Sequence, residues 1–277
     1  MPIITISRGT MSGGKALAVC LAGALGSPCV AREVLAEGAK KLGVSVEDLV
    51  DKMERSPGLW ERLTAERRVY LLATQAALAE HASTGDMVYH GLAGHLLLRD
   101  LPEVLRVRLI APIDARIQTL MEQRGITRDE AQRSILEVDQ HRARWTRLMY
   151  NADIEDPRLY DLVVNLEKTS INSACAVVVW MARQREFVVT DAARPRLTDF
   201  VVACRVRLAL ALHPASRGLD LKVSAQGGVV TLAGEVPKPQ MITHASKRWM
   251  QELRNVAEEV AGVRRVVMDL QMISAYH

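Results

Sequence analysis

The sequence of 277 residues contains few aromatic side chains, at 4%, and no long hydrophobic run. Its most apolar stretch covers residues 174–182, which is far short of the roughly 20 residues that a membrane-spanning helix needs. The start of the chain lacks a charged segment followed by an apolar one, so no signal peptide is predicted. These absences predict a soluble, cytoplasmic protein without a transmembrane segment.

Cysteine is also scarce. The four residues Cys20, Cys29, Cys175 and Cys204 show no Cys-x-x-Cys spacing. Cys20 and Cys175 fall within apolar helical patterns, which is typical of small core residues. We therefore expect no disulfide bond, no cysteine-based metal site and a reducing compartment.

Neither sign of charge dominates, since 36 Lys+Arg stand against 32 Asp+Glu and the net charge is +4. The excess falls after residue 194, where 11 basic and 7 acidic residues occur. An imbalance this small does not by itself indicate a nucleic acid or a membrane surface as the partner. We expect no nucleic-acid binding.

Short apolar runs alternate with long amphipathic ones over residues 1–188, which indicates an α/β domain with a parallel sheet. Strands are predicted over residues 3–7, 87–90, 106–111 and 160–165. Gly125 is expected to end one helix, and a capping box of Thr127 and Glu130 is expected to begin the next. A further helix is predicted over about 170–186.

A linker is predicted over 189–196, followed by a separate small α+β domain over 197–273. Its first helix carries an apolar stripe, and two alternating segments follow around a Gly227–Gly228 turn, which predicts a β-hairpin. A second amphipathic helix ends at Gly262, and alternation over 266–272 predicts a last strand. The order is αββαβ. The stripe of the first helix consists of Leu197, Val201, Cys204, Leu208 and Leu212.

The stretch "SRGTMSGGKALA" follows the first predicted strand and contains the spacing Gly-x4-Gly-Lys from Gly9 to Lys15. Glycines let consecutive backbone N–H groups converge on phosphates, the following helix offers its positive end, and Lys15 reaches the β- and γ-phosphates. The alternative is a glycine-rich turn without a ligand. The predicted nucleotide-binding residues are Gly9, Ser12, Gly13, Gly14, Lys15 and Ala16.

Ala16 stands where the motif has Ser or Thr. The missing hydroxyl normally contacts Mg²⁺, so direct coordination by the protein is expected to be weak. The ion would then be held by the phosphates of ATP and by water, because Mg²⁺ commonly keeps several water ligands. No metal-ligating residue is predicted.

Arginines are concentrated in the segment "EVDQHRARWTR", and Arg116 and Arg8 occur elsewhere in the same half. An acceptor that is itself a phosphate needs no catalytic base, because its oxygen is already anionic. Arginines solve the remaining problem, which is to bring two polyanions together. The pattern therefore favours phosphoryl transfer between nucleotides, with a solvated basic helix face as the alternative.

Residues 1 to about 187 resemble the cytidylate kinase-like branch of the nucleoside monophosphate kinases, through "ITISRGTMSGGKALA", "RLIAPIDARIQTLMEQRGITRDEA", "DQHRARW" and "DPRLYDLVVN". The resemblance implies a P-loop kinase fold with a helical lid, ATP and Mg²⁺ as cofactors, and CMP or dCMP as the acceptor. It implies catalytic roles for Lys15, Arg116, Arg142 and Arg144. The implied substrate-binding residues are Arg8, Arg32, Asp139 and Arg142.

The sequence departs from that family at several places. Met11 stands where the family usually has glycine, Ala31 replaces an aspartate, and Leu92 replaces an arginine expected to bind the acceptor nucleotide. Loss of that arginine removes a charge-assisted contact of about 1.5–3 kcal/mol. His90 and His95 flank the altered segment and are either compensating polar groups or hydrogen-bonded rim residues.

Residues 197–272 resemble the BON domain, a small module of bacterial envelope proteins, through "GLDLKVSAQGGVVTLAGEVPKP" and "EEVAGVRRVVMDL". That resemblance implies a binding module for a phospholipid or a small molecule. Basic residues are available for an anionic surface, although solvation is the simpler interpretation: Lys222, Lys247, Arg248, Arg264 and Arg265.

Three functions remain open from the sequence. The first is an active nucleotide kinase joined to a binding module. The second is a catalytically degenerate ATP-binding regulator, in which the state of the lid is coupled to what the BON-like domain binds. The third is an interaction scaffold with a vestigial pocket.

Overall fold

The computed structural model describes residues 1–31, 33–45, 64–216, 219–237 and 243–273. The first half is built on a parallel sheet of five strands in the order β2-β3-β1-β4-β5. β1 lies at the centre because Ile3, Ile4 and Ile6 are buried on both sides of it. The strands are β1 (Ile3–Arg8), β2 (Cys29–Val30), β3 (Met87–Tyr89), β4 (Val104–Ile110) and β5 (Leu162–Asn165).

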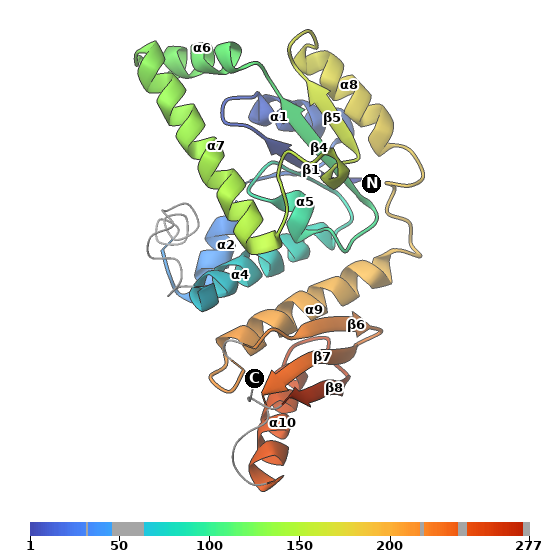
Figure 1. Cartoon of the computed structure of the whole chain (residues 1–277). Coiled ribbons are helices and arrows are strands. Elements are labelled where there is room, and N and C mark those ends of the chain that lie inside the picture. Colours follow the sequence, from blue (N-terminus) through green and yellow to red (C-terminus); the bar gives the residue numbers. More distant parts are fainter. Residues whose placement is uncertain (32, 46–63, 217–218, 238–242, 274–277) are drawn as a thin grey trace.

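Helices cover both faces of this sheet (Figure 1). α1 (Gly14–Leu25) and α8 (Ile171–Ala182) pack on one face, where Ile4, Ile6 and Leu17 share an apolar cluster. α2 (Glu33–Leu42), α4 (Thr64–Ala82) and α5 (Gly94–Leu97) cover the other face. Burial is continuous along β1 from Ile3 to Ser7, as expected for a strand that is covered on both sides.

Two helices form an arm beside the carboxyl edge of the sheet. α6 (Ile113–Arg124) ends at Gly125, and the Thr127–Glu130 capping box begins α7 (Arg128–Tyr150), as predicted. Ile117 and Ile135 are in the apolar cluster between them. The other end of α7 is anchored by the buried Trp145. A short 3₁₀ turn (Pro157–Leu159) then leads into β5.

Cys20 of α1 and Cys175 of α8 form a disulfide bond, with their Cα atoms 6.2 Å apart. The expectation of no disulfide was therefore wrong for this pair. Both residues do face the core, as expected, but the two helices pack side by side on the same face of the sheet. Contact between residues that are 155 positions apart cannot be seen from cysteine spacing alone.

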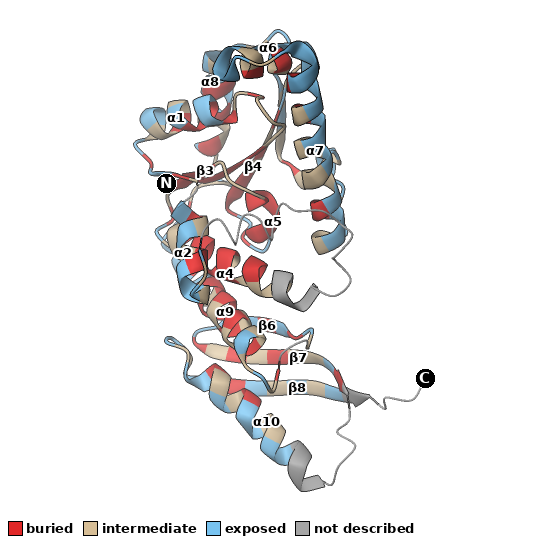
Figure 2. Ribbon diagram, turned by 90° about the vertical axis from the view of Figure 1, so that its left-hand side faces the viewer, coloured by how far each residue is buried: buried red, intermediate tan, exposed pale blue. Residues whose placement is uncertain are grey.

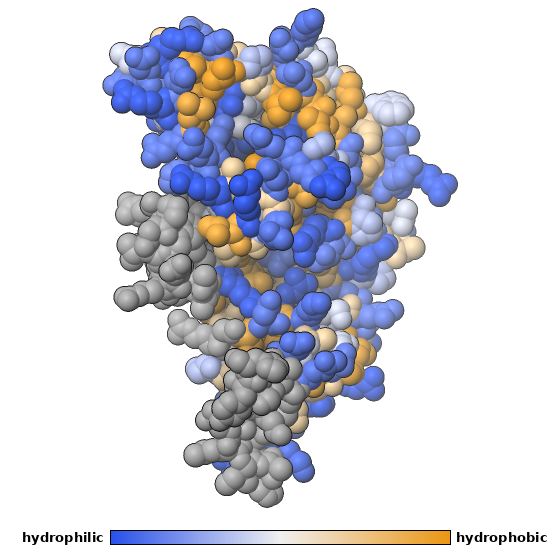
Figure 3. All heavy atoms as spheres, in the orientation of Figure 1, coloured by the Kyte–Doolittle hydropathy of each residue, from blue (hydrophilic) through white to orange (hydrophobic). Residues whose placement is uncertain are grey.

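The outer surface of α8 is unusually apolar. Its sequence, INSACAVVVWMA, has no charged residue, and Val177 and Trp180 are exposed. Figure 3 shows apolar side chains gathered around α8 and β5. No helix within the described ranges combines the length and the apolar character needed to cross a bilayer.

The second half has the predicted αββαβ order, in a three-stranded sheet β6-β7-β8. The Gly227–Gly228 turn joins the antiparallel strands β6 and β7, while β8 pairs with β7 in parallel. The elements are α9 (Arg194–Leu212), β6 (Lys222–Gln226), β7 (Val229–Pro237), α10 (Thr243–Glu258) and β8 (Arg265–Ile273).

Helix α9 belongs to two cores at once (Figure 2). One side contributes residues to the core of the first half, and they are Leu197, Phe200, Val201, Cys204 and Leu208. The opposite side contributes Val202, Val206 and Leu210 to the core of the small sheet. Of the predicted stripe, only Leu212 is exposed. α9 begins inside the predicted linker, so the two halves pack directly against each other.

Candidate nucleotide-binding site

The loop from Arg8 to Lys15 connects the central strand β1 to α1, at the carboxyl edge of the sheet. Gly13 has φ 78° and directly precedes the first turn of α1. A Cβ atom on Gly14 would collide with the side chain of Arg8. The conformation at Gly13 favours glycine, and a side chain at position 14 would displace Arg8. The N-terminal amides of α1 are thereby brought to the edge of the sheet where ligands of α/β proteins bind.

Two further features of the loop concern Ser12 and Met11, and the first of them fits a phosphate. The hydroxyl of Ser12 is buried without a hydrogen-bond partner. Met11 adopts φ 60°, a left-handed conformation that costs a non-glycine residue about 1–2 kcal/mol. The first feature offers an unused donor to an anion. The second gives a physical reason for the glycine that the resembling family has at this position.

The lid helix α7 is tied to the loop through Asp139. Its carboxylate accepts hydrogen bonds from the backbone N and the Oγ1 of Thr10, at 2.9 and 2.8 Å, and pairs with Arg116. Arg116 also donates from Nε to the Thr10 carbonyl at 2.7 Å. Burial would raise the pKa of Asp139, but the bonds from Thr10 and the charge of Arg116 outweigh it and lower the pKa.

Arg142 lies one helical turn beyond Asp139 and donates from Nη1 to Thr10 Oγ1 at 3.1 Å. Its charge acts on Arg8, which the loop itself supplies. Burial, followed by repulsion from Arg142, lowers the pKa of Arg8 to about 10. Two guanidinium groups that repel each other in this way favour binding of an anion between them.

Two cavities open on either side of this arginine pair. One, of about 240 Å³, lies along the loop and the lid and is lined by Gly9, Ser12, Arg116 and Asp139, among others. The second, of about 190 Å³, is lined by Ala31, Leu35, His90 and Leu92, among others. Arg8 and Arg142 line both cavities.

The remaining predicted residues are placed differently. Lys15 and Ala16 are exposed at the start of α1. Arg144 is exposed and donates to the carbonyl of Gln140 on its own helix. It lies two residues after Arg142, and residues two apart on a helix point to nearly opposite sides. The structure therefore brings together Arg8, Arg116, Asp139 and Arg142, but not Arg144. Arg32 lies outside the described residues.

A polar network beneath the two cavities was not anticipated. Arg108 donates from Nη1 to Ser7 Oγ at 3.0 Å, and the Tyr160 hydroxyl lies 3.2 Å from the same oxygen. Tyr160 also donates to the Ile154 carbonyl at 2.7 Å. Strand β4 contains two charged residues, Arg106 and Arg108, among apolar ones. Arg106 pairs with Asp161, and the second arginine was the signal in the sequence that pointed to this network.

The two histidines flanking the altered segment have different surroundings. Burial, then the charges of Arg108 and Arg106, lower the pKa of His95 to about 3, so its ring is neutral at physiological pH. His90 lines the smaller cavity, and its Nδ1 is buried without a partner. Burial, then Arg8, lowers the pKa of His90 as well. His90 is therefore a neutral polar group available to a ligand.

A magnesium ion has less support from the protein than a phosphate has. Ala16 offers no hydroxyl, and within the ranges that the structure describes no group of three or more His, Cys, Asp or Glu side chains is arranged to hold a metal. The residues present fit an ion that is carried by the phosphates and by water, and not one bound by the chain alone.

A parallel five-stranded sheet, a glycine loop after its central strand and a helical lid define the P-loop kinase fold. Residues 3–168 match the model of the cytidylate kinase-like family, and the chain belongs to that family. Residues 198–273 match the BON domain.

Two named relatives and one solved structure are similar to this chain. Cytidylate kinase of Pyrococcus horikoshii is 29% identical over 178 residues, which are 64% of this chain and 85% of that protein. Cytidylate kinase of Methanopyrus kandleri is 26% identical over 185 residues, 64% of this chain and 90% of that one. A solved structure of an uncharacterized protein from Eubacterium ventriosum has a TM-score of 0.52 at 18% identity, covering 67% of this chain and all of that one.

Proposed function

We propose that the chain is a nucleoside monophosphate kinase that transfers the γ-phosphoryl group of ATP to CMP or dCMP. The observation that carries this proposal is that Arg8 and Arg142 line both cavities, so they would lie between a donor in one and an acceptor in the other. The names of the relatives support a nucleotide as the substrate.

In this proposal the loop holds the donor. The amides at the start of α1, the Ser12 hydroxyl and the Lys15 ammonium group bind the triphosphate, and the lid closes over it through Asp139 and Arg142. The acceptor occupies the smaller cavity, with its phosphate toward Arg8 and Arg142 and its base toward His90. Magnesium, carried in with ATP, would neutralise part of the phosphate charge.

Transfer then requires little covalent chemistry from the protein. An anionic oxygen of the acceptor phosphate forms the new bond to the γ-phosphorus, while the bond from that phosphorus to the bridging oxygen of ADP breaks. No base is needed, because the attacking oxygen carries no proton. The two arginines neutralise the charge that would otherwise keep the reactants apart.

The test is a coupled assay of ADP production with CMP, dCMP, UMP, AMP and GMP. We expect CMP or dCMP to give the highest kcat/KM. Arg142→Gln should lower kcat by about 100-fold, because it removes a charge aimed at the transferring group. Arg133→Gln is the matched control, since Arg133 is exposed on the same helix and donates to a carbonyl of that helix.

Two outcomes would contradict the proposal. If no acceptor gives more ADP than a Lys15→Ala variant, the chain is not a nucleotide kinase. If ATP binds but no acceptor is phosphorylated, the catalytically degenerate regulator is the better description.

We also propose that the C-terminal domain binds a phospholipid or a small molecule, as the BON match suggests. The five basic residues named from the sequence are exposed, which is compatible with an anionic ligand but equally with solvation. Location in the cytoplasm, where nucleotides and ATP are available, stays a prediction.

A further inference from the structure

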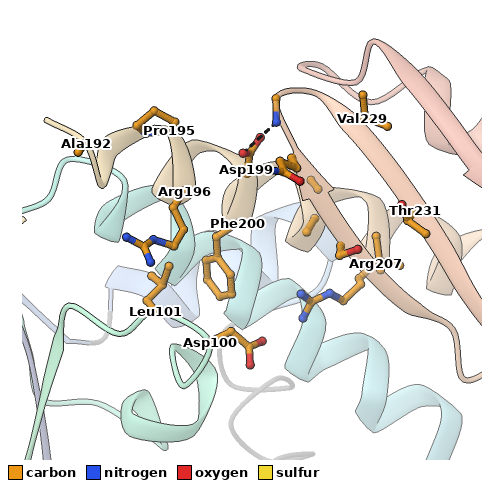
Figure 4. A pocket seen from close by; sticks show the side chains of 16 residues that line it. Asp100, Leu101, Ala192, Pro195, Arg196, Asp199, Phe200, Arg207, Val229 and Thr231 are labelled. Carbon is orange, nitrogen blue, oxygen red and sulfur yellow. Dashed lines mark hydrogen bonds between the residues drawn. The ribbon is translucent and has the colours of Figure 1, made fainter.

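A large cavity lies away from the nucleotide site, where the two halves meet. It measures about 950 Å³ and is bordered by α9, by strand β6 with its turn, and by Asp100 and Leu101 of the first half (Figure 4). A volume of this size lies within the range of small-molecule sites.

One face of α9 lines this cavity. Arg196, Phe200, Ala203 and Arg207 follow each other at spacings of three, four or seven residues, so they share one side of the helix. The two arginines are separated by about 16 Å along the helix axis, with Phe200 and Ala203 between them. Figure 4 shows Arg196, Phe200 and Arg207 on this side of α9.

The charged groups at the cavity differ in whether they have partners. Arg196 pairs with Glu103 at 2.8 Å. Asp199 accepts the backbone N–H groups of Gly227 and Gly228 at 3.0 and 3.4 Å. Asp100 lies 3.7 Å from the guanidinium of Arg99.

Among the described residues, Arg207 has no carboxylate within ion-pair distance. Its Nη1 donates to the neutral oxygen of Gln75 at 3.3 Å, and its Nε is buried without a hydrogen-bond acceptor. Its guanidinium carbon lies 6.0 Å from the centre of the Phe200 ring, so an aromatic face supports it. A guanidinium group without a negatively charged partner is a strong binding site for an anion.

We infer that this cavity is a second ligand site, which takes a small hydroxylated organic anion. Its carboxylate or phosphate group pairs with Arg207, its body packs against Phe200, and its hydroxyls meet Asp100 and the side chains of Ser224 and Thr231. Because Asp100 and Leu101 come from the first half and the strand residues from the second, the ligand would touch both. The inference does not depend on the proposed kinase activity.

Calorimetric titration of the full chain with three compounds of similar body tests this site: glucose 6-phosphate, gluconate and glucose. We expect at least one of the two anions to bind and glucose not to bind. Arg207→Gln should weaken that binding by tenfold or more, since it removes the charged donor. Arg194→Gln, an exposed arginine at the start of the same helix, should leave it unchanged.

Two more variants test whether the anion binds in this cavity and nowhere else on the chain. Ser224→Tyr fills the cavity from an exposed position on β6 without altering a charge, and should also abolish binding. Lys15→Ala should leave it intact, which distinguishes the cavity from the phosphate loop.

The inference is overturned if neither anion binds the wild-type chain, if glucose binds equally well, or if Arg207→Gln and Ser224→Tyr bind like wild type. It is also overturned if the chain binds only to vesicles of an anionic phospholipid and not to the soluble anions, because the ligand would then be a lipid surface.

Discussion

The two sides of the nucleotide cleft differ in how much charge they carry. On the side of the loop and lid, Asp139, Arg116, Arg142 and Thr10 form a continuous set of hydrogen bonds and ion pairs. In the smaller cavity, Ala31 and Leu92 replace polar residues of the resembling family, and the polar groups left are the shared Arg8 and Arg142, Ser7 and a partly buried neutral histidine, His90. Binding of the donor phosphates is therefore better supported than recognition of the acceptor.

Among the substitutions in the cleft, Asp139→Asn on the side of the loop and lid should have the largest effect on ATP binding. The substitution removes the ion pair with Arg116 and weakens the bonds from Thr10, so the lid loses its anchor on the loop. Loss of charge-assisted bonds should raise the KM for ATP by about 10- to 100-fold. Glu137→Gln, an exposed carboxylate on the same helix, should have no effect on it.

The pH dependence follows from the lowered pKa of Asp139. A carboxyl whose pKa is lowered on folding contributes fully above its ordinary pKa and loses that contribution only as the pH falls through the lowered value. The ratio between the KM for ATP of Asp139→Asn and that of the wild type should therefore be constant from about pH 5 to pH 8. A fall in the KM for ATP on substitution would instead show that Asp139 competes with the nucleotide.

Leu92→Arg, in the smaller cavity, should lower the KM for the acceptor, whereas Asp139→Asn raises the KM for ATP. An arginine there restores a cationic group next to Arg8 and Arg142 in the smaller cavity. The KM for the acceptor should fall by about tenfold or more, while the KM for ATP stays the same. Leu92→Met, which adds no charge, serves as the control. An unchanged acceptor KM in Leu92→Arg would mean that the acceptor phosphate does not lie in this cavity.

The smallest effect concerns the loop backbone. Alanine normally stabilises a folded chain relative to glycine. Met11 has φ 60°, however, and this left-handed conformation is unfavourable for alanine but not for glycine. Met11→Gly should therefore be more stable to urea than Met11→Ala, by about 1 kcal/mol. If Met11→Ala is the more stable variant, the left-handed conformation at this position is wrong.

Much of the fold was predictable from sequence periodicity. The four predicted strands are present with shifts of one or two residues at their ends, and both ends of the connection between α6 and α7 are as predicted. Strand β2 was missed because two residues, Cys29 and Val30, carry no periodic signal. For helix α9 the sequence indicated only one of the two buried sides: the predicted stripe packs against the first half, and the opposite side, with Val202, Val206 and Leu210, was not identified.

The candidate site, too, was only partly predictable from the sequence. Local motifs located the loop and the lid, since glycine spacing and a dense run of arginines are visible in a single segment. The network of Arg108, Ser7 and Tyr160 and the disulfide between Cys20 and Cys175 join residues far apart in sequence. Which arginine faces the loop depends on the rotation of α7, and composition cannot show that Arg142 does so and Arg144 does not.

The most direct measurement of the central claim is calorimetric titration of ATP, with Mg²⁺ present, into the wild-type chain and into Lys15→Ala. The account predicts one ATP bound per chain, and an affinity that falls about tenfold or more when the ammonium group is removed. Absence of binding by ATP and by the other nucleoside triphosphates, or equal affinity in the two proteins, would contradict it.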